Sequence, residues 1–368
     1  MNKNILILLI GNLRYDGRVQ KTISSLQKEN YKITLISTEF SKDDNLSDYN
    51  FPIHIIKKKT GGVFFKKIYR AIVFYLKVRR KIKDVSPDYL HCNDFSTLIY
   101  AFGFFSKTKV IYDSHELAIE TSDGITKSAI RMIEKLAVSR CYKIILPQFD
   151  RLNYFYFLYQ NKIKKEQLYL LENFPKRTLH LEDNYFLKKY NFQVDKSQYK
   201  ILSYTGIINS ERSIDTVIKA LIDIPNIIFF IIGSVNETYY SYLLKIITEN
   251  NLKERVFIKS PVPNNEMLSI ANSSDIGVCF YSDNNLNSYF CASNKIYEYI
   301  NCNKLVLSNN IAGTTRIIND NNGVLIDKIN ETSIRSALLK LINLDVVNTS
   351  HKHYYWDDQE YIFKKIYI

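Results

Sequence analysis

The sequence contains no Cys-x-x-Cys pair, and its five cysteines lie far apart along the chain. This spacing predicts neither a disulfide framework nor a zinc site, and we expect reduced, buried thiols. No uninterrupted apolar stretch approaches the ~20 residues that a membrane-spanning helix needs. We therefore expect a protein that is soluble or bound only peripherally to a membrane.

The chain also lacks two N-terminal signatures. The apolar run Ile5–Ile10 is short, and charged residues follow it where a secretion signal has its cleavage site, so we expect a buried first strand. The next loop, from Gly11 through Asp16, lacks the G-x-G-x-x-G spacing of a dinucleotide site, which argues against a dehydrogenase. A glycine before the start of a helix still leaves backbone N–H groups that favour an anion.

Length and positive charge are what the chain does have. Its 368 residues, 46% of them hydrophobic, exceed what one core usually holds, so two domains are expected. The formal net charge of +13 predicts a polyanionic partner, such as nucleic acid, anionic lipid or a phosphorylated substrate.

Short β-branched runs alternate with longer helical patterns, which predicts an α/β protein with parallel sheets covered by helices on both faces. The runs expected to form strands in the first half are Ile5–Ile10, Ile33–Ser37, Ile53–Ile56, Tyr89–Cys92, Val110–Asp113, Ile144–Leu146 and Leu168–Leu171. Those of the second half are Ile201–Tyr204, Ile227–Ile232, Val256–Ile258, Ile276–Phe280, Leu305–Ser308 and Val324–Ile326. This rhythm predicts two doubly wound, Rossmann-like domains that face a central cleft. We place them at 1–180 and 200–345, with a connector at 181–199 and a terminal helix within 346–368.

Between Lys57 and Lys83 the chain has eleven basic residues and no acidic one, and apolar residues recur among them with helical spacing. A helix with one basic and one aromatic face suits an anionic membrane surface. The alternative is a helix whose apolar side is core and whose charges are merely solvated. Nucleic-acid binding is not expected, because the aromatics do not follow the sheet-borne pattern of RNA-stacking modules. The expected membrane contacts are Lys66, Lys67, Arg70, Lys77 and Arg80.

Histidines and carboxylates end two of the expected strands of the first domain. His91–Asp94 follows one strand, and Asp113–Glu116 follows another. The carboxyl ends of parallel strands meet at one edge of a sheet, so these two clusters favour a site there over a purely structural role.

Two segments of the second half point to a diphosphate. Gly206 closes a strand and Arg212 begins the helix beyond it, where a cation can hold an anion that also meets the helix N-terminus. Farther on, Ser293 or Asn294 can cap a helix whose first turn contains Lys295, although the helix dipole disfavours a cation there. An anion bound at that end would explain the lysine. Glu298, one turn later, could accept hydrogen bonds from the vicinal hydroxyls of a ribose.

These segments, in this order, resemble the GT-B glycosyltransferases of family 4, also called group 1, over nearly the whole chain. The matching motifs are Asp16-x-Arg18-Val19, Asp113-x-His115-Glu116, the strand and helix of Ser203–Leu221, the stretch Ser293–Tyr299, and the closing Trp356 and Tyr367. In the family the closing helix crosses back to the first domain, and we expect the same here.

The resemblance implies a role for each site residue. Glu298 would bind the ribose, and Lys295 and Arg212 the diphosphate of a nucleotide-sugar, with Gly206, Ser293 and Asn294 beside it. His115, from the other domain, would touch the transferred sugar, and Asp16 and Gly11 would lie near the acceptor or the diphosphate. Family members generally retain the anomeric configuration, and neither a metal nor another cofactor is expected, because cationic side chains neutralise the leaving group.

Two departures from the family pattern stand out. Many members have an arginine where this chain has Ile207, and an acidic residue where it has Phe290. The expected function is a cytoplasmic glycosyltransferase on the inner membrane face, which moves a sugar, UDP-linked on family frequency, to a lipid-linked or polysaccharide acceptor of the cell surface. The alternatives are a GT-B sugar-nucleotide epimerase or hydrolase, a catalytically inactive nucleotide-sugar-binding subunit and, with least support, a nucleic-acid-binding protein.

Overall fold

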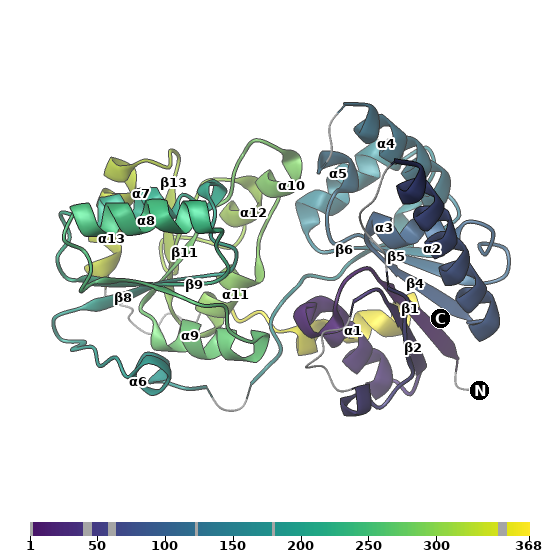
Figure 1. Ribbon diagram of the computed structural model, residues 1–368, viewed down its shortest axis with the longest axis horizontal. Coiled ribbons are helices and arrows are strands. Elements are labelled where there is room, and N and C mark those ends of the chain that lie inside the picture. The colour runs from purple at the N-terminus through teal and green to yellow at the C-terminus, as the bar shows by residue number, and fades with distance from the viewer. Residues whose placement is uncertain (1–2, 40–45, 58–63, 122–123, 179–180, 345–351) are drawn as a thin grey trace. The chain divides into compact units, whose positions relative to one another are not determined.

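The computed structural model describes residues 3–39, 46–57, 64–121, 124–178, 181–344 and 352–368. The chain divides into two compact units. Unit 1 comprises Met1–Asn173 together with Trp356–Ile368, and unit 2 comprises Phe174–Tyr355. Each unit is built around one parallel sheet (Figure 1).

The sheet of unit 1 has seven strands in the order β3-β2-β1-β4-β5-β6-β7, all parallel. The strand order reverses direction between β1 and β4, which makes the carboxyl ends of these strands the expected place for a ligand. The strands are β1 (Asn4–Leu9), β2 (Lys32–Ser37), β3 (Ile53–Ile55), β4 (Tyr89–Asn93), β5 (Lys109–Asp113), β6 (Lys143–Leu146) and β7 (Leu168–Leu170).

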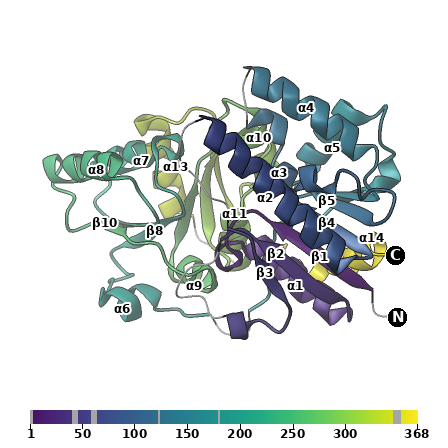
Figure 2. The same ribbon diagram turned by 45° about the vertical axis from the view of Figure 1, so that its right-hand side comes forward.

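Helices cover both faces of this sheet (Figure 2). On one face α1 (Gly17–Lys28) buries Val19, Ile23 and Leu26 against alternate residues of β1. On the other face α2 (Phe64–Val85) contributes Phe74, Val78 and Ile82, which recur every four residues as one side of a helix. The remaining helices are α3 (Asp94–Leu98), α4 (Gly124–Val138) and α5 (Phe149–Tyr159).

The end of the chain belongs to unit 1. Trp356 begins a short 3-10 helix, and α14 (Tyr361–Ile366) follows it. The indole of Trp356 is fully buried in the α1 core and donates a hydrogen bond to the Ser25 hydroxyl at 2.8 Å. The backbone carbonyl of Ile368 accepts hydrogen bonds from Tyr89 and Lys109, each at 2.7 Å.

The sheet of unit 2 has six parallel strands in the order β10-β9-β8-β11-β12-β13. It reverses direction between β8 and β11, as the sheet of unit 1 does between β1 and β4. The strands are β8 (Lys200–Thr205), β9 (Ile227–Ile232), β10 (Val256–Lys259), β11 (Ile276–Cys279), β12 (Leu305–Asn309) and β13 (Gly323–Ile326).

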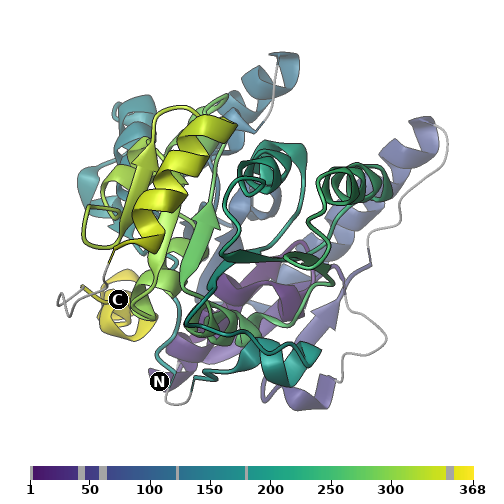
Figure 3. The ribbon, with the colours of Figure 1, turned by 90° about the vertical axis from the view of Figure 1, so that its left-hand side faces the viewer.

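Alternate side chains of β9 pack on opposite faces of this sheet. Phe229 and Ile231 pack under α7 (Ile214–Ala220), α8 (Glu237–Glu249) and α13 (Glu331–Ile342), the last of which crosses the front of the sheet in yellow-green in Figure 3. Phe230 and Ile232 face the opposite side. That side is covered by α6 (Tyr185–Tyr190), α9 (Met267–Ser273) and α11 (Asn294–Asn301).

The structure departs from the sequence-based expectation in several segments. The expected connector at 181–199 contains α6 and belongs to unit 2. The ring of Phe186 in α6 stacks on that of Phe230, with 4.1 Å between the ring centres. The sequence pattern predicts helices at Thr97–Phe105 and Thr314–Ile318 and a loop from Ser282 to Tyr289. The structure instead has α3 at Asp94–Leu98, α12 at Ala312–Thr315 and a short helix, α10, at Leu286–Tyr289. Among the residues described, no helix combines the length and apolar character needed to span a bilayer.

Candidate functional site

Gly206 directly follows the carboxyl end of β8, and any other residue at this position would strain the backbone. Gly206 has φ +120°, a region that side chains rarely adopt. Its N–H donates to the carbonyl of Ile232 at 2.9 Å, and the neighbouring Gly233 is so close that a Cβ there would lie 1.6 Å from the Gly206 carbonyl oxygen. The two glycines let the ends of β8 and β9 meet directly.

Lys295, in the first turn of α11, reaches this glycine. A Cβ on Gly206 would lie 2.6 Å from the Lys295 Nζ, and the same Nζ lies 4.6 Å from the centre of the Tyr204 ring. Burial lowers the pKa of Lys295, and the positive charge of Arg212 lowers it further, while the carboxylate of Glu298 raises it. The three charged side chains therefore lie within electrostatic reach of one another, and an anion would compensate the two partly buried cations.

Arg212 lies across the point where the strand order reverses. It ends the short 3-10 helix after β8, yet its Nη1 donates to the carbonyl of Phe280, at the end of β11, at 3.3 Å. Its guanidinium lies 4.9 Å from the centre of the Tyr281 ring. At this distance the guanidinium makes a cation–π contact with the ring, and an arginine can bind phosphate oxygens in a bidentate manner.

The N-terminus of α11 is held by its surroundings rather than by a side-chain cap. Ser293 occupies the N-cap position, but its hydroxyl bonds with the Tyr281 hydroxyl and makes no capping bond to the helix. Asn294 is the first helical residue. The expectation that Ser293 or Asn294 caps the helix is therefore met in position but not in hydrogen bonding. The first-turn amides thus lack the side-chain acceptor that usually satisfies them.

Glu298 lies one turn after Lys295 on the same helix, with only 9% of its surface exposed. Its neighbours Tyr297 and Tyr299 are buried in the core beneath α11, and the hydroxyl of Tyr299 donates to the carbonyl of Ser203 in β8 at 3.0 Å. This packing anchors the helix to the sheet, so the position of Glu298 relative to the end of β8 is fixed.

The two departures from the family pattern have distinct settings. Ile207 directly follows Gly206 and is 65% exposed. Phe290 ends α10, and Gly313 of α12 packs so closely that a Cβ there would lie 2.4 Å from the backbone of Cys291. Ile207 thus places an exposed apolar side chain where many family members have a cation. Phe290 lies in a loop that packs against α12.

In unit 1, two sequence motifs meet in a buried ion pair. Asp113, at the end of β5, is fully buried, and the guanidinium of Arg18 from α1 contacts both of its carboxylate oxygens at 2.8–3.2 Å. Arg18 also donates to the carbonyl of Leu171 at 2.9 Å. Burial alone would raise the pKa of Asp113, but Arg18 and His115 hold it well below its usual range. The pair joins α1, β5 and the end of β7.

His115 lies between two carboxylates. Its Nδ1 is 3.5 Å from Asp94, and its Nε2 is 3.5 Å from Asp113. Burial lowers the pKa of His115, but the two carboxylates outweigh this effect and raise it to about 9. The ring is therefore a cation at neutral pH, with both N–H groups directed at carboxylates.

Asp94 is a site residue that the sequence reasoning did not select. It has φ +62°, which is strained for a residue other than glycine, and it accepts backbone N–H bonds from His115 at 2.9 Å and Glu116 at 3.3 Å. Its side chain is 40% exposed. Its place at the end of a strand beside a histidine cluster was the available signal.

A second histidine links this cluster to the end of the chain. His91 is fully buried in β4, with its Nε2 3.7 Å from Asp113 and its Nδ1 bonded to the Tyr367 hydroxyl. A Tyr367 hydroxyl that donates to Nδ1 leaves the Nε2 hydrogen directed at Asp113. The terminal segment thus supports the carboxylate that His115 faces.

Gly11 and Asp16 shape the loop after β1. Gly11 has φ +143°, and its carbonyl accepts a bond from the Ser37 hydroxyl at 2.6 Å. Asp16 is the N-cap of α1, and its carboxylate accepts the Val19 N–H at 3.0 Å. The carboxylate of Asp16 is thus engaged in helix capping. No cluster of three or more metal-ligating side chains occurs among the described residues.

The basic helix α2 has two different faces. Phe74, Val78 and Ile82 are buried in the core, whereas Phe65, Tyr69, Ile72 and Leu76 are 80%, 68%, 52% and 58% exposed. The basic residues expected at a membrane are exposed or, in one case, half-buried along the same helix: Lys66, Lys67, Arg70, Lys77 and Arg80. The Lys58 and Lys59 positions lie outside the described residues.

Comparisons with known proteins agree with this geometry. A family model for glycosyl transferases group 1 matches residues 188–355, and a glycosyl transferase 4-like model matches residues 6–148. The first match lies in unit 2 and the second in unit 1. No curated protein sequence matches the chain.

Solved glycosyltransferases have a similar fold. Sucrose-phosphate synthase from Thermosynechococcus elongatus is 14% identical, with a TM-score of 0.70, over 92% of this chain and 90% of that one. HepE from Anabaena, solved with UDP and glucose, has the same identity, TM-score and coverage. The catalytic domain of starch synthase IV from Arabidopsis thaliana, bound to ADP and acarbose, is 10% identical, with a TM-score of 0.69, over 100% of this chain and 99% of that one.

At such low identity the structural likeness shows the fold, and the two family matches, which fall on the two Rossmann-like units, show the relationship in sequence. The chain therefore belongs to the group 1 glycosyltransferases and has their GT-B fold.

Proposed function

We propose that unit 2 of this glycosyltransferase binds a nucleoside diphosphate sugar through the convergence of Lys295, Arg212 and Glu298 at the end of β8. The supporting observation is the pair of cations, one packed against Gly206 and the other stacked on Tyr281. Two cations held on aromatic rings, with a glycine that admits close approach, suit a pyrophosphate. The carboxylate of Glu298 would accept hydrogen bonds from the hydroxyls of the adjoining ribose.

The same groups suit the chemistry of transfer. Charge develops on the diphosphate as the bond to the anomeric carbon breaks, and donors already aimed at that charge lower the barrier. We propose that Lys295 and Arg212 carry this role without a metal ion, and that transfer retains the anomeric configuration by a front-side route. UDP is the first nucleotide to test, since HepE was solved with UDP, although starch synthase IV was solved with ADP.

We assign the acceptor to unit 1. His115, which the two carboxylates keep charged at neutral pH, would lie beside the transferred sugar, and the partly exposed carboxylate of Asp94 is suited to positioning hydroxyls of the acceptor. The exposed apolar and basic residues of α2 suit contact with the inner membrane face, and we propose a lipid-linked or polysaccharide acceptor there and a role in cell-surface glycan synthesis.

The test is a thermal-shift screen of the purified protein against nucleoside diphosphates, followed by turnover of the matching sugar nucleotides. Stabilisation by one diphosphate and transfer to an added acceptor are expected. Release of free sugar or a change at C2 without acceptor would instead identify a hydrolase or epimerase. Binding without turnover would identify an inactive subunit, the minor alternative that Ile207 and Phe290 keep open. Absence of any diphosphate binding would contradict the proposal.

A further inference from the structure

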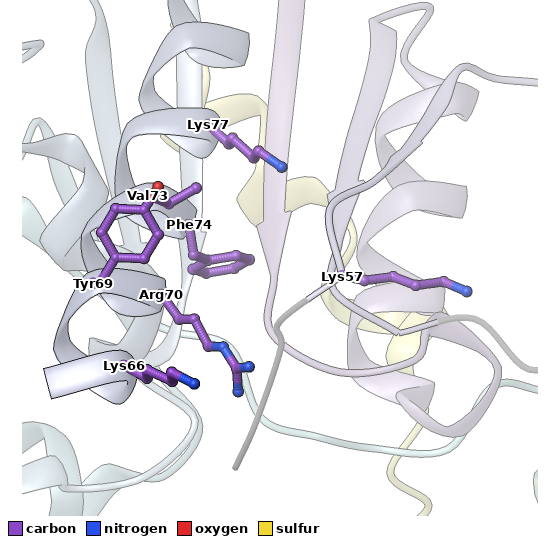
Figure 4. Close-up of a pocket in the computed structure, with 7 residues that line it drawn as sticks. All are labelled: Lys57, Lys66, Tyr69, Arg70, Val73, Phe74 and Lys77. Carbon is purple, nitrogen blue, oxygen red and sulfur yellow. The ribbon is translucent and has the colours of Figure 1, made fainter. Parts of the chain in front are cut away.

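A groove of about 370 Å³ lies beside α2 (Figure 4). Among the described residues, seven line it: Lys57, Lys66, Tyr69, Arg70, Val73, Phe74 and Lys77. All but Lys57 come from α2, and Lys57 follows strand β3. Arg70, Phe74 and Lys77 extend from the helix toward the segment that carries Lys57. The volume lies in the range of small-molecule sites.

The lining combines positive charge with an apolar floor. Four of the seven residues are cations and none is acidic. Phe74 is only 6% exposed and joins the core, whereas Tyr69 is 68% exposed at the rim. The cations select an anion, and the ring and aliphatic carbons between them favour a ligand with hydrocarbon next to its charge.

The surface around the groove identifies the occupant. Phe65, Ile72 and Leu76 are more than half exposed on the same helix. An apolar stripe of this size on a soluble surface is costly unless a partner covers it, and an amphipathic helix with basic residues beside such a stripe lies in the interface of a bilayer. Nucleic acid and free phosphate satisfy the cations alone, whereas a lipid satisfies both features.

We propose that this groove binds the phosphate headgroup of an anionic membrane phospholipid, with Lys66, Arg70 and Lys77 on the phosphate and Tyr69 and Phe74 against the adjoining carbons. The inference rests on the membrane contact proposed above and makes it specific. It divides the basic residues of α2 into a group that lines the groove and a group, with Lys67 and Arg80, that does not.

The helix offers a matched pair of variants to test this division. The triple variant Lys66→Gln, Arg70→Gln, Lys77→Gln removes three charges from the groove, and Lys67→Gln, Arg80→Gln, Lys83→Gln removes three exposed charges outside it. The measurement is sedimentation of the full-length protein with phosphatidylcholine vesicles, with and without phosphatidylglycerol. The groove variant should bind the anionic vesicles ~100-fold more weakly, at about fivefold per lost charge, and the outer variant less than tenfold more weakly. Equal losses would overturn the groove and leave a diffuse membrane contact intact.

Two further measurements separate the groove from other sources of binding. Val73→Trp fills the groove without changing charge and should also weaken vesicle binding, whereas unchanged binding would overturn the site. Monomeric short-chain phosphatidylglycerol should compete with vesicles at a concentration at which inorganic phosphate does not. Competition by phosphate at the same concentration, or loss of duplex DNA binding in the groove variant alone, would contradict a lipid site. UDP binding by every variant, measured in parallel, keeps failure of the groove distinct from failure of the donor site.

Discussion

The ammonium of Lys295 lies 2.6 Å from the point that a Cβ on Gly206 would occupy. The glycine directly follows β8 and the lysine lies in the first turn of α11, so the close contact joins the start of α11 to the end of β8, one of the two strands at the reversal of strand order in unit 2. The absence of a side chain at Gly206 is therefore a condition for the position of the cation.

Gly206→Ala should displace Lys295 and weaken nucleotide binding. We expect the affinity for the diphosphate to fall at least ~10-fold, because a charge-assisted hydrogen bond of about 1.5–3 kcal/mol is disturbed. The positive φ should also lower the free energy of unfolding by about 1–3 kcal/mol. Calorimetric titration and urea unfolding measure the two effects.

The control for backbone strain is Gly124→Ala in α4. Gly124 also has a positive φ, at +57°, but a Cβ there would meet no atom within 4 Å. This variant should lose stability and keep its nucleotide affinity. If both alanine variants bound the nucleotide as the wild type does, the contact between Gly206 and Lys295 would have no role in the site.

Glu298→Gln should remove the preference for ribose. A carboxylate accepts hydrogen bonds from two hydroxyls more strongly than an amide does. Because 2′-deoxy-UDP lacks one of these hydroxyls, the wild type should bind UDP more tightly than 2′-deoxy-UDP. The variant should bind the two nucleotides with nearly equal affinity. Isothermal titration with both nucleotides measures this double-mutant cycle. An unchanged preference in the variant would place the ribose elsewhere.

The pKa of His115 gives unit 1 a pH-dependent stability. The folded pKa of about 9 exceeds the ordinary value near ~6.5. A group with a raised folded pKa contributes its full stability below the unfolded value, and this contribution is lost as the pH rises toward the folded value. The wild type should therefore lose about 2–3 kcal/mol more than His115→Asn between pH 6.5 and 9. Parallel stability curves for the two proteins would show that the carboxylates do not hold His115 as a cation.

Arg18→Ala should destabilise unit 1 strongly. Removing one partner leaves the Asp113 carboxylate buried and unpaired, which typically costs about 3–5 kcal/mol. Lys28→Ala is the matched control, because Lys28 lies on the same helix as Arg18 and pairs with Glu360 but is 52% exposed, and such pairs contribute at most about 1 kcal/mol. Urea unfolding compares them. Equal effects of the two substitutions would mean that the Arg18–Asp113 pair is not essential to the unit.

Every strand that the sequence predicts is present, because strands buried on both faces appear as short β-branched runs. The helices α6 and α10 were missed, since six and four residues are too few to show a helical period. The motifs around Arg18 and Asp113 were both visible, but their pairing depends on tertiary packing across 95 residues. The sequence left two interpretations of α2 open, a membrane-facing helix and a core helix, because the apolar spacing is the same in both. In the structure Phe65, Tyr69, Ile72 and Leu76 are exposed.

The site of unit 2 was predictable in its residue types and not in its contacts. The glycine, the two cations and the acidic residue could be selected from strand ends and helix starts. The stacking of Arg212 on Tyr281 and the bond between Tyr281 and Ser293 depend on the neighbouring strand β11, whose place beside β8 the sequence does not state.

The central claim is that Arg212 and Lys295 together hold a diphosphate. Its most direct test is calorimetric titration of UDP, and of ADP if UDP fails, into the wild type, Arg212→Ala, Lys295→Ala and the double variant. Lys219→Ala is the control, since Lys219 belongs to the same unit, is half-buried and pairs with Glu331 rather than with the site. Each single substitution should weaken binding at least ~10-fold, as the loss of a charge-assisted contact predicts, and the double variant should show no measurable binding. Undiminished binding by the double variant would contradict the account.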